Sequence, residues 1–225
     1  MKSDYLGILS SIKQDIERYE ISQTNKPTLI IVTKSQSNKD IEKVVEAGNK
    51  CLGENYVDEA IKKINFFKTR SLEWHFIGQI QSNKIKKISE YFDWVQTISS
   101  IKHAKLLNQA CERLSKKMNI CIQVNIDREQ SKSGILIEDL DDLVKNILPL
   151  NNLILRGLMA IPSKINALKE NINSYKILKA EYDRLSSEYI HMDTLSIGMS
   201  NDYKLALDNG SNMIRIGTLI FGNRK

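Results

Sequence analysis

The stretch that decides the fold is residues 28–55, TLIIVTKSQSNKDIEKVVEAGNKCLGEN. It opens with an apolar run at Leu29–Thr33, whose shortness and β-branched residues predict a buried strand. Ser37–Ala47 then repeats apolar residues with a helical period, and Lys50–Gly53 is a second, weaker apolar run. A strand, a helix and a strand in this order predict two parallel strands joined by a right-handed crossover.

The same alternation continues outward from this unit to the end of the chain. The further strand candidates are Glu73–Gly78, Trp94–Ile98, Ile120–Ile126, Ile154–Met159, Thr194–Gly198 and Met213–Gly217. The further helix candidates are the amphipathic N-terminus, Asn55–Phe67, Ser82–Tyr91, Ile101–Lys117, Ile137–Leu148, Ile165–Tyr189 and Asn201–Asp208. Strands that alternate with helices in this way are typical of parallel α/β proteins.

Eight strand candidates in 225 residues predict an α/β fold, a single (β/α)8 TIM barrel with an extra N-terminal helix. An open doubly wound sheet with fewer strands is the alternative, because the run at Lys50–Gly53 is weak. The chain has no Pro- or Gly-rich linker and no clear internal repeat, so we expect one domain over residues 1–225.

The composition is that of a globular protein, with 41% hydrophobic and 27% charged residues. The net charge is +6, but 25 of the 33 basic residues are Lys and they are interspersed among 27 acids. This pattern predicts a solvated Lys-rich surface and no nucleic-acid partner. No apolar run is long enough to span a membrane, and the N-terminus lacks the apolar core of a signal peptide, so we expect a cytoplasmic protein.

Cysteine and histidine are few and dispersed, at Cys51, Cys111, Cys121, His75, His103 and His191. The odd number of cysteines and the lack of a C-x-x-C motif argue against a disulfide framework and against a structural zinc site. Cys121 lies in the apolar run ICIQVNI and is expected to be a small core residue. His75 alternates with Glu73 and Ile77, which favours a core histidine over a catalytic one. The sequence therefore predicts no metal site.

Function in a (β/α)8 barrel sits at the C-terminal ends of the strands and in the loops that follow them. Lys34 comes directly after the apolar run Leu29–Thr33, so its side chain would emerge at the mouth of the barrel. A lysine held there can act as an amine nucleophile toward an aldehyde. The alternative is a lysine whose charged end simply reaches the solvent at the rim.

Two further loops carry small polar residues. Ser200 precedes the helix candidate Asn201–Asp208 and is expected to cap it, leaving the free N–H groups of its first turn as an anion site. Gly217 and Thr218 end the last strand, where glycine allows close approach of a ligand and threonine adds a hydroxyl. Loops after the seventh and eighth strands are the recurrent phosphate site of this fold. With Lys34, they predict a pocket for a phosphorylated carbonyl compound, whereas each loop alone could be an ordinary cap or turn.

Arg215 lies two residues before Gly217, on the same side of the last strand. A buried arginine cannot lose its proton and needs an acceptor. A pyridine nitrogen could be this acceptor. The nitrogen would then stay unprotonated, which makes the pyridine ring a weaker electron sink. The alternative is a structural ion pair with Glu54 or Asp202.

A series of segments forms a recognisable pattern over nearly the whole chain. They are Val32-Thr33-Lys34, Gly53–Val57 (GENYV), Trp74–Lys84 (WHFIGQIQSNK), Gln123-Val124-Asn125, Ser131–Gly134 (SKSG), Gly157-Leu158-Met159, Leu195–Asp202 (LSIGMSND) and Arg215–Thr218 (RIGT). In this order they resemble the family of pyridoxal 5′-phosphate (PLP) homeostasis proteins, whose fold is like the N-terminal barrel of alanine racemase. The family usually has Ser at position 33, His at 79 and Met at 197, where this chain has Thr33, Gln79 and Ile197.

The resemblance implies a role for each candidate residue. Lys34 would carry PLP as a Schiff base (an aldimine), and Arg215 would face the pyridine nitrogen. The phosphate would be held by Ser200, Gly217 and Thr218, and Asn55 would line the ring pocket. None of the three departures from the family removes one of these contacts, and Gln79 brings no titratable group to the rim.

The implied function is a PLP-binding protein of vitamin B6 homeostasis that buffers the cofactor or delivers it to apo PLP-dependent enzymes. We expect a monomer and no enzymatic activity. The alternative is a PLP-dependent amino-acid racemase of low activity with Lys34 as one base. The opposite base of alanine-racemase-like enzymes is a Tyr from a second domain, which is not expected here. A phosphate-binding barrel without PLP is a third interpretation.

The basic stretch Lys84–Lys87 is expected to be a solvated helix face, with a protein or RNA contact as the alternative.

Overall fold

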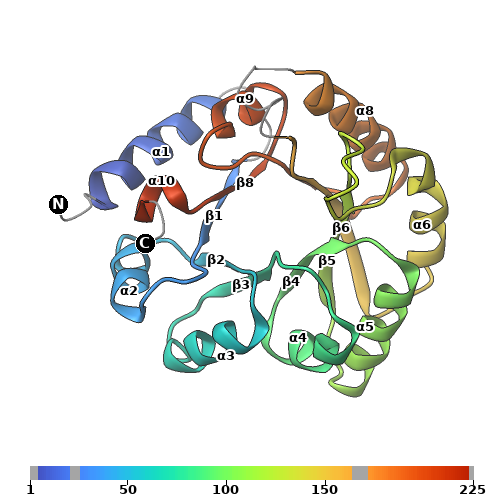
Figure 1. Cartoon of the computed structure of the whole chain (residues 1–225), viewed down its shortest axis with the longest axis horizontal. Helices are drawn as coiled ribbons and strands as arrows, with labels where there is room; N and C mark the ends of the chain where they lie inside the picture. The colour runs from blue at the N-terminus through green and yellow to red at the C-terminus, as the bar shows by residue number, and fades with distance from the viewer. Residues whose placement is uncertain (1–4, 21–25, 164–171, 223–225) are drawn as a thin grey trace.

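The computed structural model describes residues 5–20, 26–163 and 172–222. Its strands form one closed barrel in which each strand pairs in parallel with the next along the chain, and β8 pairs with β1 (Figure 1). The strands are β1 (Thr28–Val32), β2 (Cys51–Glu54), β3 (Glu73–Phe76), β4 (Trp94–Ile98), β5 (Met118–Val124), β6 (Leu153–Ala160), β7 (Thr194–Ser196) and β8 (Met213–Ile216). The predicted (β/α)8 barrel is confirmed, and the open sheet is wrong because β1 and β8 close the circle.

The weakest strand candidate is a strand because it has a neighbour on each side. In β2, Leu52 lies opposite Ile31 of β1 and opposite Trp74 of β3. Gly53 has no room for a side chain, since a Cβ there would lie 2.9 Å from Cγ2 of Ile30. The segment is therefore held by its place in the sheet more than by its own β-propensity.

Helices surround the barrel, and every described segment of predicted helix contains one, with shifted ends. They are α1 (Tyr5–Glu20), α2 (Asn38–Glu46), α3 (Val57–Phe66), α4 (Ile85–Tyr91), α5 (Ile101–Arg113), α6 (Leu140–Ile147), α8 (Asn173–Glu188), α9 (Tyr203–Asp208) and α10 (Thr218–Phe221). Short 3-10 turns, η1 (Ser82–Lys84) and η2 (Ile137–Asp139), precede α4 and α6. Residues 165–171 of the predicted helix Ile165–Tyr189 lie outside the described residues. Helix α10 was not predicted.

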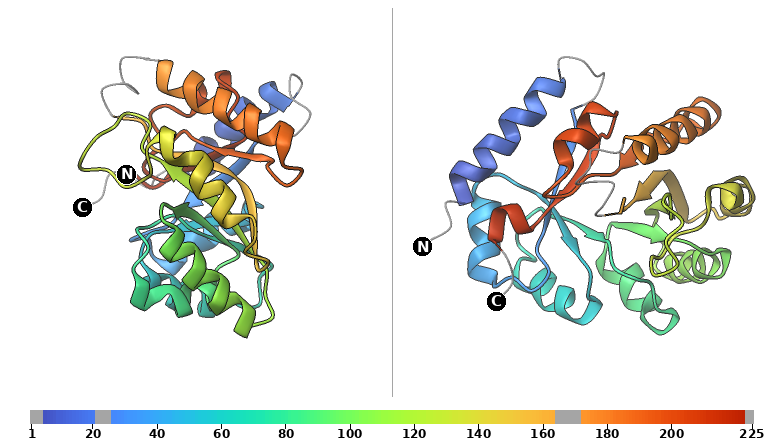
Figure 2. Two further views of the ribbon diagram at one scale, coloured as in Figure 1. Left: turned by 90° about the vertical axis from the view of Figure 1, so that its right-hand side faces the viewer. Right: turned by 45° about the horizontal axis from the view of Figure 1, so that its top comes forward.

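The N-terminal helix α1 packs on the outside of the barrel beside α2, α9 and α10 (Figures 1 and 2). Leu9, Ile12 and Ile16 repeat at helical spacing and are buried. Asp15 on the same side accepts a hydrogen bond of 2.7 Å from the Tyr203 hydroxyl of α9. Helix α1 therefore belongs to the fold. No helix among the described residues is long and apolar enough to cross a membrane.

Side chains alternate between the two faces of the strands and so build two cores. Outward-facing residues such as Ile31 pack against the helices in one large cluster. A smaller cluster fills the barrel itself, with Ile30, Trp94, Cys121, Met159 and Met213. Cys121 is completely buried, which confirms the expectation of a small core residue.

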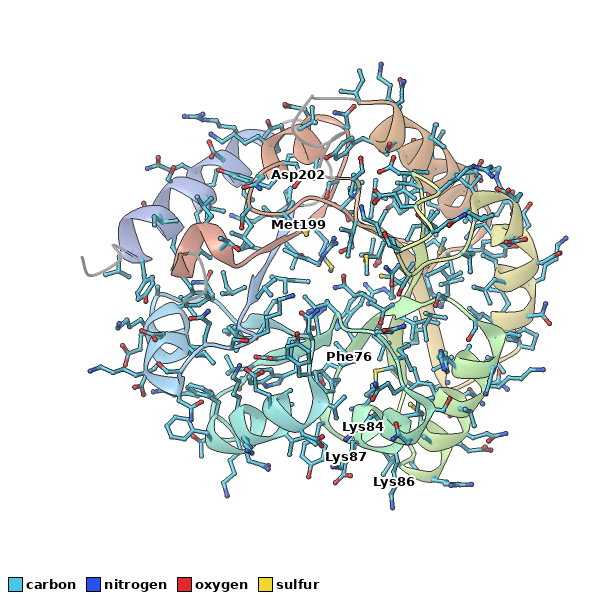
Figure 3. All side chains as sticks on the ribbon, in the orientation of Figure 1. Phe76, Lys84, Lys86, Lys87, Met199 and Asp202 are labelled. Atoms are coloured by element: carbon cyan, nitrogen blue, oxygen red, sulfur yellow. The ribbon has the colours of Figure 1, made fainter. Side chains whose placement is uncertain are left out.

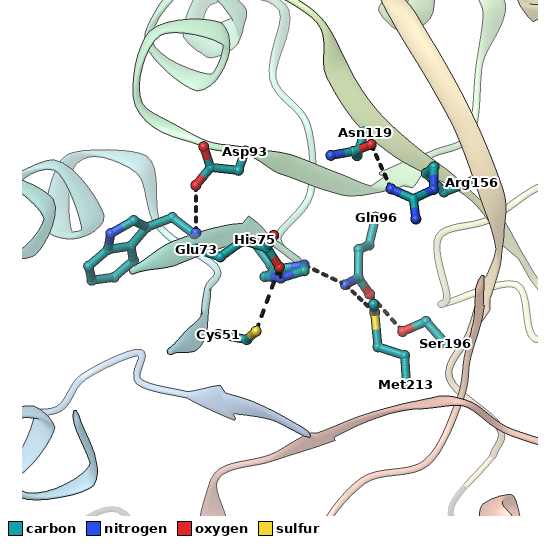
Figure 4. A network of polar contacts seen from close by, with 10 residues as sticks. Cys51, Glu73, His75, Asp93, Gln96, Asn119, Arg156, Ser196 and Met213 are labelled. Carbon is teal, nitrogen blue, oxygen red and sulfur yellow. Dashed lines mark hydrogen bonds and ion pairs between the residues drawn. The ribbon is translucent and has the colours of Figure 1, made fainter. Parts of the chain in front are cut away.

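The barrel interior also holds buried polar side chains. They include His75, Gln96, Ser196 and Arg215. Buried polar groups need hydrogen-bond partners. Gln96 contacts both His75 and Ser196 (Figure 4), and Arg215 donates to the Ser196 hydroxyl. This chain of contacts runs through the barrel interior.

Candidate functional site

The candidate residues of the sequence come from four strands that are consecutive around the barrel. Lys34 follows β1, Asn55 follows β2, Ser200 follows β7, and Gly217 and Thr218 follow β8. Arg215 lies on β8 itself. All the strands are parallel, so these residues gather at one side of the C-terminal mouth.

The ends of β8 and β1 approach each other closely at this mouth. A Cβ at Gly217 would lie 3.1 Å from both Cβ and the carbonyl oxygen of Val32. Val32 is two residues before Lys34, so the end of β8 packs directly against the strand that presents the lysine. Position 217 needs a glycine for this strand packing, in addition to any approach of a ligand.

Ser200 is held against the start of α10, and its predicted role as a helix cap is wrong. Helix α9 begins at Tyr203 after Asp202, and no side chain caps it. The Ser200 hydroxyl instead accepts a hydrogen bond of 3.1 Å from the Leu219 backbone N–H in the first turn of α10. Ser200 and Thr218 thus border one small surface of hydroxyls and backbone N–H groups.

Asp202 anchors the loop that carries Ser200. Its buried carboxylate accepts hydrogen bonds from the Met199 backbone N–H (2.7 Å) and from the Tyr175 hydroxyl (2.6 Å). Figure 3 shows Met199 and Asp202 on this loop between β7 and α9. The carboxylate fixes the loop and forms no ion pair with Arg215, although its charge opposes the lowering of the Arg215 pKa by burial.

Arg215 is buried in the barrel interior below the mouth, with 3% of its surface exposed. Its guanidinium donates to the Ser196 hydroxyl (2.6 Å) and to the Ala160 carbonyl (2.9 Å). Burial lowers the pKa of Arg215 to about 10. The alternative of a structural ion pair with Glu54 or Asp202 is wrong for the described residues, because Glu54 is paired with Lys63.

A buried ion-pair network fixes the backbone on one side of Lys34. The Thr33 hydroxyl donates to Glu54 Oε1 at 2.6 Å, and Lys63 Nζ donates to the same oxygen at 2.7 Å. Lys63 Nζ also donates to the Thr33 carbonyl at 2.6 Å. Burial raises the pKa of Glu54, and the hydrogen bonds from Lys63 and Thr33 oppose that rise.

The same lysine fixes the other side of Lys34. Lys63 Nζ donates to Glu59 Oε1 at 2.5 Å, and this oxygen also accepts from the Ser35 backbone N–H at 2.6 Å. Ser35 has a φ of 62°, an unfavourable conformation for a residue other than glycine. Lys63 therefore fixes the backbone of both residues next to Lys34, Thr33 directly and Ser35 through Glu59. No sequence motif marks Lys63, although it falls on the buried side of its helix with Val57 and Ala60.

Asn55 presents a polar atom without a partner. Its side-chain Oδ1 is buried and accepts no hydrogen bond from the described residues. Its backbone is fixed by Gly78 after β3, where a Cβ would lie 2.0 Å from the Asn55 carbonyl oxygen. A buried amide oxygen of this kind is costly unless a water or a ligand supplies a donor.

The basic stretch Lys84–Lys87 lies on the outside of the barrel, in the turn η1 and the helix α4 that follow β3. Lys84 and Lys87 form ion pairs of 2.5 and 2.7 Å with Asp58, and they lower the pKa of Asp58 to about 2. Figure 3 places Lys84, Lys86 and Lys87 at the outer edge of the helical ring. The predicted solvated helix face agrees with this position, with Ile85 as its buried contact.

Comparison with known proteins gives matches over almost the entire chain. Residues 9–225 match the family model described as the alanine racemase N-terminal domain. The chain is 41% identical over 224 residues to the pyridoxal phosphate homeostasis protein of Pasteurella multocida, and the match covers 96% of each protein. It is 42% identical over 200 residues to the protein of the same name from Escherichia coli, covering 88% of this chain and 86% of the relative.

Solved structures agree with these matches. PipY of Synechococcus elongatus, solved without PLP, is 29% identical and superposes with a TM-score of 0.88 over 97% of this chain and 100% of its own. The same protein with PLP bound gives a TM-score of 0.86 at 28% identity, with the same coverage. An alanine racemase from Clostridium difficile is 14% identical with a TM-score of 0.70, over 96% of this chain and 60% of the racemase, so it shares the fold alone. The chain belongs to the alanine racemase N-terminal domain family and, within it, to the pyridoxal phosphate homeostasis proteins.

Proposed function

We propose that this chain binds PLP at the mouth of the barrel, as a Schiff base to Lys34. The observation that carries the proposal is the meeting of Lys34, the unpartnered Asn55 Oδ1 and the Ser200–Leu219 contact at the ends of neighbouring strands. An amine, a ring pocket and a set of phosphate donors are the three contacts that PLP requires. The residues present therefore fit the group.

Each residue has a part in this proposal. Lys34 would hold PLP through its amine as a Schiff base, whose formation releases water, and Asn55 would line the ring pocket. Ser200, Gly217 and Thr218 hold the phosphate through hydroxyls and the backbone N–H groups at the start of α10. Arg215 would face the pyridine nitrogen and keep it unprotonated, so that bound PLP would supply a weaker electron sink than it would beside a carboxylate.

The role we propose is PLP homeostasis, in which the protein buffers the cofactor or delivers it to apo PLP-dependent enzymes. The names of the curated relatives and the PLP-bound structure of PipY support this role. We further propose that residues 1–225 form one non-catalytic PLP-binding domain, which acts as a monomer in the cytoplasm.

Borohydride reduction tests the attachment point. Reduction of the PLP-loaded protein should fix one pyridoxyl group per chain, and peptide mapping should find it on Lys34. A Lys34→Ala variant should lose this label and the absorbance of the Schiff base, whereas the exposed-lysine control Lys105→Ala should keep both. If the label lies on any other lysine in the protein without substitutions, the proposed attachment to Lys34 is wrong.

An isotope experiment separates the homeostasis role from racemisation. Racemisation needs a proton donor on each face of the ring and a strong electron sink. We expect the PLP-loaded protein in deuterated water to leave the α-proton of common amino acids unexchanged, as measured by NMR. Exchange that depends on Lys34 would instead favour the racemase.

A further inference from the structure

Three side chains with metal-binding atoms meet at the end of the barrel opposite Lys34. Cys51 is the first residue of β2 and lies in register with Glu73, the first residue of β3. His75 is two residues further along β3 and therefore points to the same face as Glu73. The Cys51 thiol, a Glu73 carboxylate oxygen and a His75 ring nitrogen all lie within 4.8 Å of one another. Figure 4 shows them at one end of the polar chain.

The distances suit a small cation of the zinc type. Glu73 Oε1 is 2.8 Å from His75 Nε2 and 3.6 Å from Cys51 Sγ. Tetrahedral zinc has bonds of about 2.0–2.3 Å to N, O and S, which places its ligand atoms about 3–4 Å apart. Small side-chain shifts would bring all three atoms onto one ion. Thiolate, imidazole and carboxylate together form a donor set that zinc accepts.

The surroundings give such an ion an entrance and a supported ligand. A cavity of about 410 Å³ opens at this end of the barrel, and its lining includes Cys51, Glu73 and Trp94. The second ring nitrogen of His75, Nδ1, lies 3.0 Å from the side-chain amide of Gln96, which is itself fixed by the Ser196 hydroxyl. In this arrangement the Gln96 amide nitrogen faces Nδ1, whereas the outer partner of a metal-bound histidine accepts a hydrogen bond from the second ring N–H. Coordination through Nε2 requires the Gln96 amide to present its oxygen to Nδ1–H.

We propose that Cys51, Glu73 and His75 bind one divalent cation of the zinc class, with water from the cavity as the fourth ligand. As the metal–sulfur bond forms, the thiol S–H bond breaks and its proton passes to solvent, with no change of oxidation state. The site is separate from the proposed PLP site and does not depend on it.

Cobalt is the probe for this site, because a thiolate–Co²⁺ bond gives a charge-transfer band in the near ultraviolet. Chelator-treated full-length protein should bind one Co²⁺ per chain with this band. Cys51→Ser, at a half-buried position, should lose it, and Cys111→Ala, which removes a buried thiol from α5, should keep it. Absence of stoichiometric binding, or an unchanged band in Cys51→Ser, would overturn the proposal.

Zinc competition against bound cobalt gives the affinities. Loss of an outer-shell partner typically weakens metal binding by about 10- to 100-fold. The loss of zinc affinity in Gln96→Met should fall in that range. The loss in Cys51→Ser, which removes a direct ligand, should be larger. Equal zinc affinity in Cys51→Ser and Cys111→Ala would also overturn the proposal, whether or not borohydride labels Lys34.

Discussion

Replacing Lys63 with methionine should destabilise the protein by about 3–5 kcal/mol, the usual cost of removing one partner from a buried ion pair. Lys63 is 4% exposed and Glu54 is fully buried, so the change leaves a carboxylate in a low-dielectric site without its cation. The Thr33 carbonyl and Glu59 each lose one of their donors at the same time. Urea unfolding monitored by circular dichroism would measure the change in the free energy of unfolding.

The loss of stability should depend on pH. Burial already raises the pKa of Glu54 above its ordinary 4.5, and without Lys63 the opposing contribution disappears, so the pKa rises further. The native state then binds the Glu54 proton more tightly than the unfolded state does, and stability falls as pH rises through the native pKa. The deficit of Lys63→Met relative to the unmodified protein should therefore be larger at pH 8 than at pH 5.

Two variants isolate the buried pair. Lys62→Met changes the exposed neighbour on the same helix and should stay within about 0.5 kcal/mol of the unmodified protein. The double variant Glu54→Gln/Lys63→Met removes the stranded charge and should recover part of the stability and lose the pH dependence. A cost for Lys63→Met no greater than that for Lys62→Met would contradict the role given to the pair.

The same network connects stability to the proposed PLP site. Lys63 holds the Thr33 carbonyl directly and the Ser35 N–H through Glu59, so it fixes the backbone on both sides of Lys34. Folded Lys63→Met at low temperature should therefore retain PLP less tightly than Lys62→Met. The Lys34 amine would still be present, but its direction would no longer be fixed.

Periodicity was enough to predict the barrel, because eight short apolar runs alternate with helical segments. It could not show that the weak run at Lys50–Gly53 pairs on both sides, since that depends on Ile31 and Trp74 from elsewhere in the chain. Helix α10 was missed because its four residues are too few for a period to appear. These are contributions of tertiary context, which a local pattern does not contain.

The strand-end positions of the candidate site could also be predicted, but the hydrogen-bond partners could not. Ser200 has the residue type of a helix cap, yet its hydroxyl binds the N–H of Leu219, 19 residues away. Arg215 finds its acceptors on β6 and β7 instead of an acid. Cys51 and His75 looked unrelated by spacing, and only the β2–β3 register brings them together.

Among single added methyl groups at the barrel mouth, the one in Gly78→Ala should reduce the stability of the protein most. The added Cβ would lie 2.0 Å from the Asn55 carbonyl oxygen and 2.7 Å from its carbonyl carbon, both of which are backbone atoms. Gly78 cannot simply move away, because its own carbonyl accepts a hydrogen bond of 2.7 Å from the buried Thr97 hydroxyl. We expect a loss of at least about 3 kcal/mol, the upper part of the range for overpacking.

Gly48→Ala is the matched control, since it adds the same methyl group in open space. Nothing lies within 4 Å of a Cβ at Gly48, so only its φ of 84° penalises alanine, by about 1–2 kcal/mol. Urea unfolding should separate the two variants. In PLP titrations of the folded proteins, Gly78→Ala should bind PLP more weakly, because the methyl group displaces Asn55, and Gly48→Ala should bind it normally. Equal stability and equal PLP affinity would mean that the ends of β2 and β3 can separate freely, and Asn55 would then owe its position to something other than Gly78.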